Sequence, residues 1–243
     1  MENIAQQTLA SIVTGNHQVV PVLEKYQLDF CCKGKRTLSE ACLEKGLSVD
    51  TVLNELELFI PKEEKKKMHF NLMNAEQLIS YILVHHHFYV KQSMPTIFGH
   101  LEKVATKHGV RFPEMVIVFQ LFAAVREEMA LHIQKEELVL FPRIKEVEKL
   151  YTNRQKTKLT AGYINGPVTV MEMEHEHAGE LLEDIRRLTN NYTQPADACT
   201  TFKLSLAELK EFEEDLHRHV HLENHLLFPL AKKMLKLVNA EKE

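Results

Sequence analysis

A histidine and a glutamate four residues apart occur twice in this chain, in closely similar surroundings. The two segments are HIQKEELVLFP at 132–142 and HVHLENHLLFP at 219–229. Residues four apart share one face of a helix, so each pair presents an imidazole and a carboxylate together. The pairs are His132 with Glu136 and His219 with Glu223. Each is followed at the same offset by Leu-Phe-Pro, where we expect the helix to end, and this repetition in register indicates an internal repeat.

Two further histidines precede these pairs at matching distances. His87 lies 45 residues before His132, and His175 lies 44 residues before His219. The spacing predicts two helical hairpins, each with one histidine on its first helix and His-x-x-x-Glu on its second. Apolar residues at helical intervals place His175 and His87 on buried faces. His86 lies on a neighbouring apolar stripe, so the choice between His86 and His87 stays open.

Four imidazoles and two carboxylates on buried faces suit a metal centre. Burying each without a partner costs about 1–3 kcal/mol or more, and a bound ion removes that cost. Such ligands suit iron, manganese or zinc, and the lack of a thiolate among them argues against a structural zinc site. Six ligands fit two ions, each held by two histidines and bridged by both carboxylates, and four-helix bundles are known to hold such centres. None of the six candidates forms the Glu-x-x-His pair of ferritin-like sites, because their spacing is His-x-x-x-Glu.

The ordinary alternative is that these residues form solvated helix faces or salt bridges along one helix. The histidines outside the repeat register are open to two interpretations as well, a metal-entry route or solvated faces. They are His85, His86, His177, His217, His221 and His225.

The elements that must position these residues are helices. The 243 residues are 44% hydrophobic with only 8 Gly and 8 Pro, which favours an all-α fold. We expect an up-down-up-down four-helix bundle over 74–237, a charged linker over 61–73, and a small helical N-terminal domain over 1–60. The net charge of −4 gives no case for nucleic acid. No signal peptide or membrane-spanning run is evident, so we expect a cytoplasmic protein that binds no membrane.

A pair of adjacent cysteines, Cys31 and Cys32, interrupts the predicted N-terminal helices. Lys33, Lys35 and Arg36 follow it, and nearby cations lower the pKa of a thiol, so one of the pair is a candidate reactive thiolate. The alternative is packing at a helix end. A homodimer formed through the N-terminal domain is a further hypothesis.

Both parts of the chain resemble the RIC (repair of iron centres) di-iron family, also called the ScdA/YtfE/DnrN group. The resemblance rests on LDFCCKGKRTLSEAC at 28–42, EHEHAGELLEDI at 174–185, NNYTQPADACTTFK at 190–203 and the two His-x-x-x-Glu segments. The ligand set that it implies is His87, His132, Glu136, His175, His219 and Glu223. The first bundle helix departs most, because the family's His-Asp-x-x-His appears here as HFYV at 87–90.

The resemblance implies a hemerythrin-like bundle with two non-haem iron ions joined by an oxo bridge. It implies a non-enzymatic role, in which the protein donates iron and so repairs iron–sulfur clusters that nitrosative or oxidative stress has damaged. Its partners would be damaged iron–sulfur proteins as clients, and NO or O₂ as small ligands. It further implies redox work, or iron or NO handling, for Cys31 and Cys32. Glu128 and Glu174 resemble acidic positions near the family's centre, where they would support the ligands or line an iron path, although ordinary surface carboxylates explain them equally well.

Two other functions fit the same residues. One is a hemerythrin-like module that binds or senses O₂ or NO, and the other is a di-iron enzyme that reduces NO or peroxide.

Overall fold

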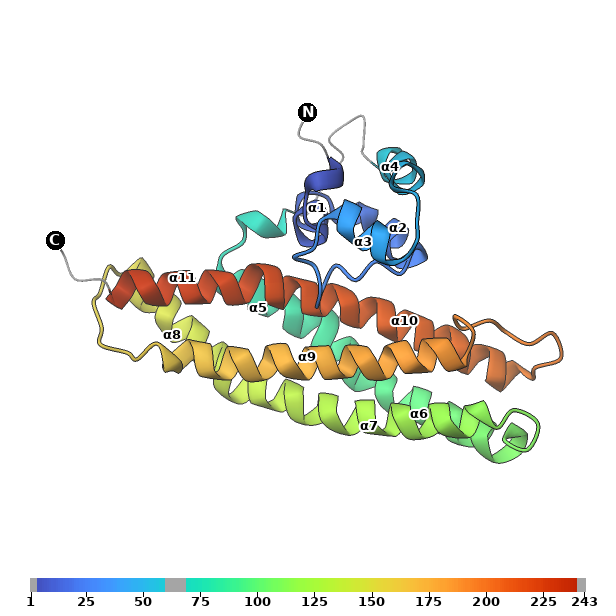
Figure 1. Ribbon diagram of the computed structural model, residues 1–243. Coiled ribbons are helices and arrows are strands. Elements are labelled where there is room, and N and C mark those ends of the chain that lie inside the picture. Colours follow the sequence, from blue (N-terminus) through green and yellow to red (C-terminus); the bar gives the residue numbers. More distant parts are fainter. Residues whose placement is uncertain (1–3, 60–68, 240–243) are drawn as a thin grey trace.

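The computed structural model describes residues 4–59 and 69–239, and within these ranges the chain is helical (Figure 1). Four long helical rods run side by side in alternating directions, and a cluster of short helices lies over the middle of the fourth rod. The predicted all-α fold with an up-down-up-down bundle is confirmed. Most of the predicted linker, residues 61–68, lies outside the described residues.

Three of the four rods contain a π-helical turn between two α-helices. The first rod consists of α5 (Ala75–Tyr81), the π turn η4 (Ile82–His87) and α6 (Phe88–His108). The second consists of α7 (Glu114–Lys135), η5 (Glu136–Leu140) and α8 (Phe141–Thr152). The third is α9 (Gly162–Leu188) alone. The fourth consists of α10 (Thr200–Leu222), η6 (Glu223–Leu227) and α11 (Phe228–Asn239).

The expectation that Phe-Pro ends two of these helices is wrong. Helices α8 and α11 continue directly through Pro142 and Pro229. A proline clashes with the carbonyl four residues before it and donates no hydrogen bond, but each proline here follows a π turn. The N–H of Phe141 donates to the carbonyl of Glu136, five residues back, and the wider turn gives the proline room.

The N-terminal part contains the short helices that the sequence predicts. They are α1 (Leu9–Gly15), α2 (Val20–Lys25), α3 (Leu38–Glu44) and α4 (Val49–Leu58). Helix α3 begins at a capping box, in which Thr37 and Glu40 satisfy each other's backbone N–H groups. Leu9, Leu23 and Phe30 are fully buried, and they continue into the apolar core of the bundle.

The apolar core of the bundle is divided into two clusters. One includes Phe122 and Phe212 and is continuous with the N-terminal core. The other includes Ile144, Phe228 and Leu235 near the opposite end of the rods. The predicted ligands fall between the two clusters, so the polar centre is enclosed by apolar packing on both sides.

Candidate metal centre

Six buried side chains converge at the middle of the bundle. Each is at most 1% exposed, and they come from all four rods. They form two groups whose ligand atoms lie within 4.8 Å of one another: His87, Glu136, His219 and Glu223, and His132, Glu136, His175 and Glu223. The structure therefore brings together all six residues that the repeat singles out, and both carboxylates belong to both groups.

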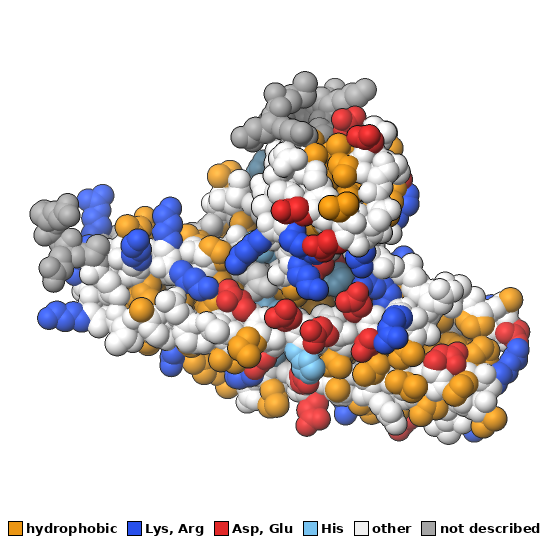
Figure 2. Space-filling view, viewed as in Figure 1, with side chains coloured by type: hydrophobic (Ala, Val, Ile, Leu, Met, Phe, Trp, Pro, Cys, Tyr) orange, Lys and Arg blue, Asp and Glu red, His pale blue; other side chains and the backbone are white. Residues whose placement is uncertain are grey.

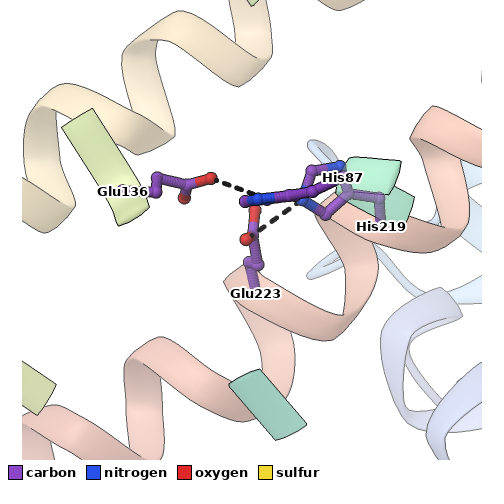
Figure 3. A group of neighbouring side chains, drawn as sticks. All are labelled: His87, Glu136, His219 and Glu223. Atoms are coloured by element: carbon purple, nitrogen blue, oxygen red, sulfur yellow. Dashed lines mark ion pairs between the residues drawn. The ribbon is translucent and has the colours of Figure 1, made fainter. Parts of the chain in front are cut away.

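The imidazoles present their Nε2 atoms to the carboxylates (Figure 3). Oε2 of Glu136 lies 3.3 Å from Nε2 of His87 and 3.3 Å from Nε2 of His132. Each oxygen of Glu223 contacts a different histidine: Oε1 lies 3.1 Å from Nε2 of His219, and Oε2 lies 3.1 Å from Nε2 of His175. Each carboxylate thus spans one histidine of each group, which is the arrangement of a ligand that bridges two ions.

Several of these atoms are buried with unused lone pairs. Among the described residues, Nε2 of His87 and of His219 and both oxygens of Glu136 and Glu223 have no hydrogen-bond partner, although they lie close together. A buried polar group without a partner costs about 1–3 kcal/mol. Cations placed among these atoms would satisfy them, so the donor set fits a pair of metal ions with nitrogen and oxygen ligands.

The charges of the centre favour ionised carboxylates. Burial opposes ionisation of Glu223, but His219 and His175 outweigh it and hold the pKa of this carboxyl well below its usual range. Burial likewise disfavours the imidazolium of His132, yet the negative charge of Glu136 beside it and the hydrogen bond with Glu174 raise its pKa to about 10. Two anionic carboxylates in an apolar enclosure give a strong attraction for cations.

An outer layer of hydrogen bonds orients three of the four imidazoles through Nδ1. Nδ1 of His87 bonds Glu137 Oε1 at 2.9 Å, and Nδ1 of His175 bonds Asn224 Oδ1 at 3.0 Å. Glu137 and Asn224 are the residues that follow the two bridging glutamates, so the repeat extends to this layer. The two side chains differ in type, which conceals the correspondence in the sequence, but the oxygen of either one accepts a hydrogen bond.

Glu174 and Glu128 lie in different surroundings. Glu174 Oε2 lies 2.9 Å from Nδ1 of His132, and Lys135 also contacts this carboxylate. Glu128 instead pairs at 3.2 Å with His177, and both side chains are about half exposed, at 41% and 55%. Glu174 therefore supports a histidine of the centre, while the histidine that pairs with Glu128 lies at the surface.

Of the two open candidates on the first rod, the structure brings His87 into the centre. Adjacent His86 is also buried, but its Nδ1 lies 3.0 Å from Asp215 Oδ1, and its ring stacks on His219 at 5.5 Å with an interplanar angle of 4°. The π turn η4 contains both histidines.

The N-terminal part docks on histidines of the fourth rod. His217 lies 2.8 Å from Glu24, Nε2 of His225 lies 2.7 Å from the carbonyl oxygen of Cys31, and His221 packs against the ring of Phe30. The sequence allows two interpretations of these histidines, a metal-entry route or solvated helix faces, and neither includes a contact with the N-terminal part. Their regular spacing of four residues was a signal of a shared face that contacts another element.

The two cysteines lie at this junction, beside the centre. Cys31 and Cys32 are free thiols with their sulfurs 3.8 Å apart, and Cys32 Sγ is 3.7 Å from the backbone carbonyl of His175. The expectation of a lowered thiol pKa is wrong for Cys31. Its hydrogen bond with Cys32, its burial and the neighbouring carboxylate of Asp29 raise the pKa of this thiol well above its usual value.

A cavity of about 160 Å³ adjoins the cysteines where the N-terminal part meets α9. Charged side chains of both signs gather at this junction on the face seen in Figure 2. They include Lys33, Arg36, Glu176, Glu180 and Arg186. Both cysteines line this cavity, and Cys32 is the more exposed of the two.

None of the helices in the described part of the chain combines the length and the apolar character needed to cross a membrane.

Comparison with known proteins agrees with both parts of the structure. Residues 78–231 match the hemerythrin HHE cation binding domain, and residues 5–59 match a domain of unknown function, DUF542. The iron-sulfur cluster repair protein YtfE of Enterobacter sp. (strain 638) is 34% identical over 225 residues, which cover 93% of this chain and 96% of that protein. The protein of the same name from Escherichia coli O81 is 33% identical over the same shares. The chain therefore belongs to the hemerythrin HHE cation-binding family and, along nearly its whole length, to the YtfE group within it.

Proposed function

We propose that the centre holds two non-haem iron ions joined by an oxo bridge. His87 and His219 would bind one ion, His132 and His175 would bind the other, and Glu136 and Glu223 would bridge them. The support is the shared position of both carboxylates in the two four-residue groups, together with the buried oxygens and nitrogens that have no partner among the described residues.

From this centre we infer that the protein repairs iron–sulfur clusters damaged by nitrosative or oxidative stress, by supplying iron to them. Relatives that match 93% of the chain carry the name of iron–sulfur cluster repair proteins. Bound iron supplies the metal for rebuilding a cluster and a site for NO or O₂. The chain's own residues hold the ions in an apolar enclosure and fix the imidazoles through Glu137, Glu174 and Asn224.

The N-terminal part, which we propose as a separate domain, places Cys32 beside the centre. Its sulfur lies 3.7 Å from the His175 carbonyl and lines the charged cavity at the junction. A thiol in this position is suited to bind iron or NO that reaches this face of the bundle, because thiolates bind both. Cys31 is buried and donates to Asp29, so we assign it the role of holding the loop that carries Cys32.

The decisive experiment measures iron content and cluster repair on the same protein. The purified chain should contain about two irons, as the number of ligands implies. Incubated with an iron–sulfur dehydratase whose cluster has been destroyed by NO, it should restore activity while losing iron to the client. A protein with two irons that restores nothing would refute the repair function and leave the metal centre standing.

The same preparation separates the other functions. A stable, reversible spectrum with O₂ or NO and no transfer of iron would identify a binding or sensing module. Many turnovers of NO or peroxide with a reductant would identify an enzyme.

A further inference from the structure

The two halves of the centre differ at one position of the outer layer. By the repeat, the residue before the first-helix histidine of one hairpin should support the second-helix histidine of the other hairpin. On one side this residue is Glu174, which bonds Nδ1 of His132 at 2.9 Å. Its counterpart is His86, and Nδ1 of His219 has no hydrogen-bond partner among the described residues. His219 is therefore the one histidine of the four without an acceptor behind it.

This difference weakens the binding of one ion. A histidine whose second nitrogen donates to an acceptor is held in position and is a better ligand, and loss of that acceptor typically lowers metal affinity about 10- to 100-fold. The other histidine of each position is supported, His87 by Glu137 and His175 by Asn224. The two positions therefore still differ in the support of His132 and His219. The position between His87 and His219 is thus the weaker of the two.

His86 has the surroundings of a metal ligand without belonging to either group. Its Nδ1 lies 3.0 Å from the carboxylate of Asp215. In the same way, Glu137 and Glu174 each contact Nδ1 of a histidine of the centre. Its ring is 5% exposed and stacks parallel to that of His219 at 5.5 Å. A support of this kind leaves the other nitrogen, Nε2, available to a metal.

His86 also lines a cavity between the N-terminal part and the bundle. The cavity has a volume of about 390 Å³, and its wall includes Thr14 and Phe30 from the N-terminal part and His85, Asp215 and Arg218 from the bundle. The cavity adjoins the His219 side of the centre, because His86 forms part of its wall and stacks on His219. His86 is therefore in contact both with a ligand of the weaker position and with this cavity.

We propose that the ion between His87 and His219 is the one that the protein gives up first, and that His86 accepts it from His219 at the wall of this cavity. The step exchanges a coordination bond to His219 Nε2 for one to His86 Nε2, with Asp215 accepting the hydrogen on Nδ1. The ion keeps its charge, and no electron is transferred. This inference rests on the proposed di-iron centre and names the ion and the residue that deliver it.

The location is tested on the wild-type protein. Reduced protein with two irons is treated with a ferrous chelator until one equivalent is removed, and anomalous diffraction at the iron edge then shows which position is still occupied. We expect iron between His132 and His175 only. Iron remaining between His87 and His219, or equal loss from both positions, overturns the proposal. A starting content below two irons would instead count against the proposed function itself.

The role of His86 is tested by the rate of the first release. His86→Phe keeps an aromatic ring against His219 but removes the nitrogen ligands. His85→Phe is a matched control in the same cavity, since His85 is exposed and its ring lies against Tyr81. The proposal expects His86→Phe to bind two irons and to release the first more slowly than both the wild type and His85→Phe, because the departing ion then has no second imidazole to pass to. Release at the wild-type rate or faster assigns His86 to packing alone and overturns its transfer role. Should His86→Phe not fold, the diffraction measurement on the wild type still decides which ion leaves.

Discussion

The contrast between Glu174 and Glu128 gives the sharpest test of the outer layer. Both are surface-accessible glutamates that pair with histidine, at 2.9 Å for Glu174 with His132 and 3.2 Å for Glu128 with His177. His132 is fully buried in the centre, whereas His177 is about half exposed. Removing the carboxylate should therefore affect metal binding at only one of the two positions.

The expected size follows from what Glu174 does for His132. Glu174→Ala removes the acceptor of His132 Nδ1 and should weaken binding of the ion between His132 and His175 by about 10- to 100-fold, which is about 1.4 to 2.8 kcal/mol. Glu174→Gln keeps a neutral acceptor, and a charge-assisted hydrogen bond is about twice as strong as a neutral one, so its effect should be intermediate. Glu128→Gln and Glu128→Ala should stay within about twofold of wild type, as expected for an exposed pair.

The measurement is a competition titration of iron against a chelator of known affinity, with thermal unfolding of each variant to exclude loss of fold. The reasoning predicts the order wild type, Glu174→Gln, Glu174→Ala for falling affinity. Equal affinities across the Glu174 series, or an equal loss in the Glu128 series, would refute the claim that the hydrogen bond to His132 supports the metal.

Three further outcomes follow from the same geometry. Because Glu223 belongs to both four-residue groups whereas His132 belongs to one, Glu223→Ala should lose both irons and His132→Ala should retain about one, as metal analysis would show. Removal of iron from the wild type should lower its Tm, since an ion bound to the native state alone stabilises it and its loss exposes the buried atoms to their desolvation cost; equal Tm values with and without iron would contradict this. A Cβ at Gly34 would lie 2.2 Å from the carbonyl oxygen of Phe30 and 2.7 Å from Nε2 of His225, so Gly34→Ala should loosen the N-terminal part by about 1–3 kcal/mol, measured by limited proteolysis. Gly15→Ala, with nothing within 4 Å of its Cβ, is the control, and equal proteolysis of the two variants would show that the close approach is not needed.

The centre could be predicted from the sequence because its ligands lie at fixed intervals on helices. An interval of four residues sets a shared face wherever the helix lies, so His132 with Glu136 and His219 with Glu223 needed no tertiary information. The repeat then located His175 and narrowed the first rod to His86 or His87. The same logic predicted the helices of the N-terminal part and the four-helix bundle.

The path of the backbone at the centre was harder to predict. Pro142 and Pro229 indicated helix ends, whereas the structure continues through π turns. Local rules for proline describe an ordinary α-helix, and the extra residue of a π turn changes which carbonyl faces the proline. The same kind of turn on the first rod, η4, sets which of His86 and His87 reaches the centre.

The sequence by itself determined which residues share a helix face, and with that the helical fold and every residue of the centre except the choice between His86 and His87. Only the tertiary structure decided their neighbours on other rods: Glu137 behind His87, Glu174 behind His132, and Asp215 behind His86. These partners lie 42 to 129 residues apart in the chain. The physical reason is that periodicity fixes the direction of a side chain about its own helix axis, while the contact between two helices depends on how packing shifts and rotates one against the other.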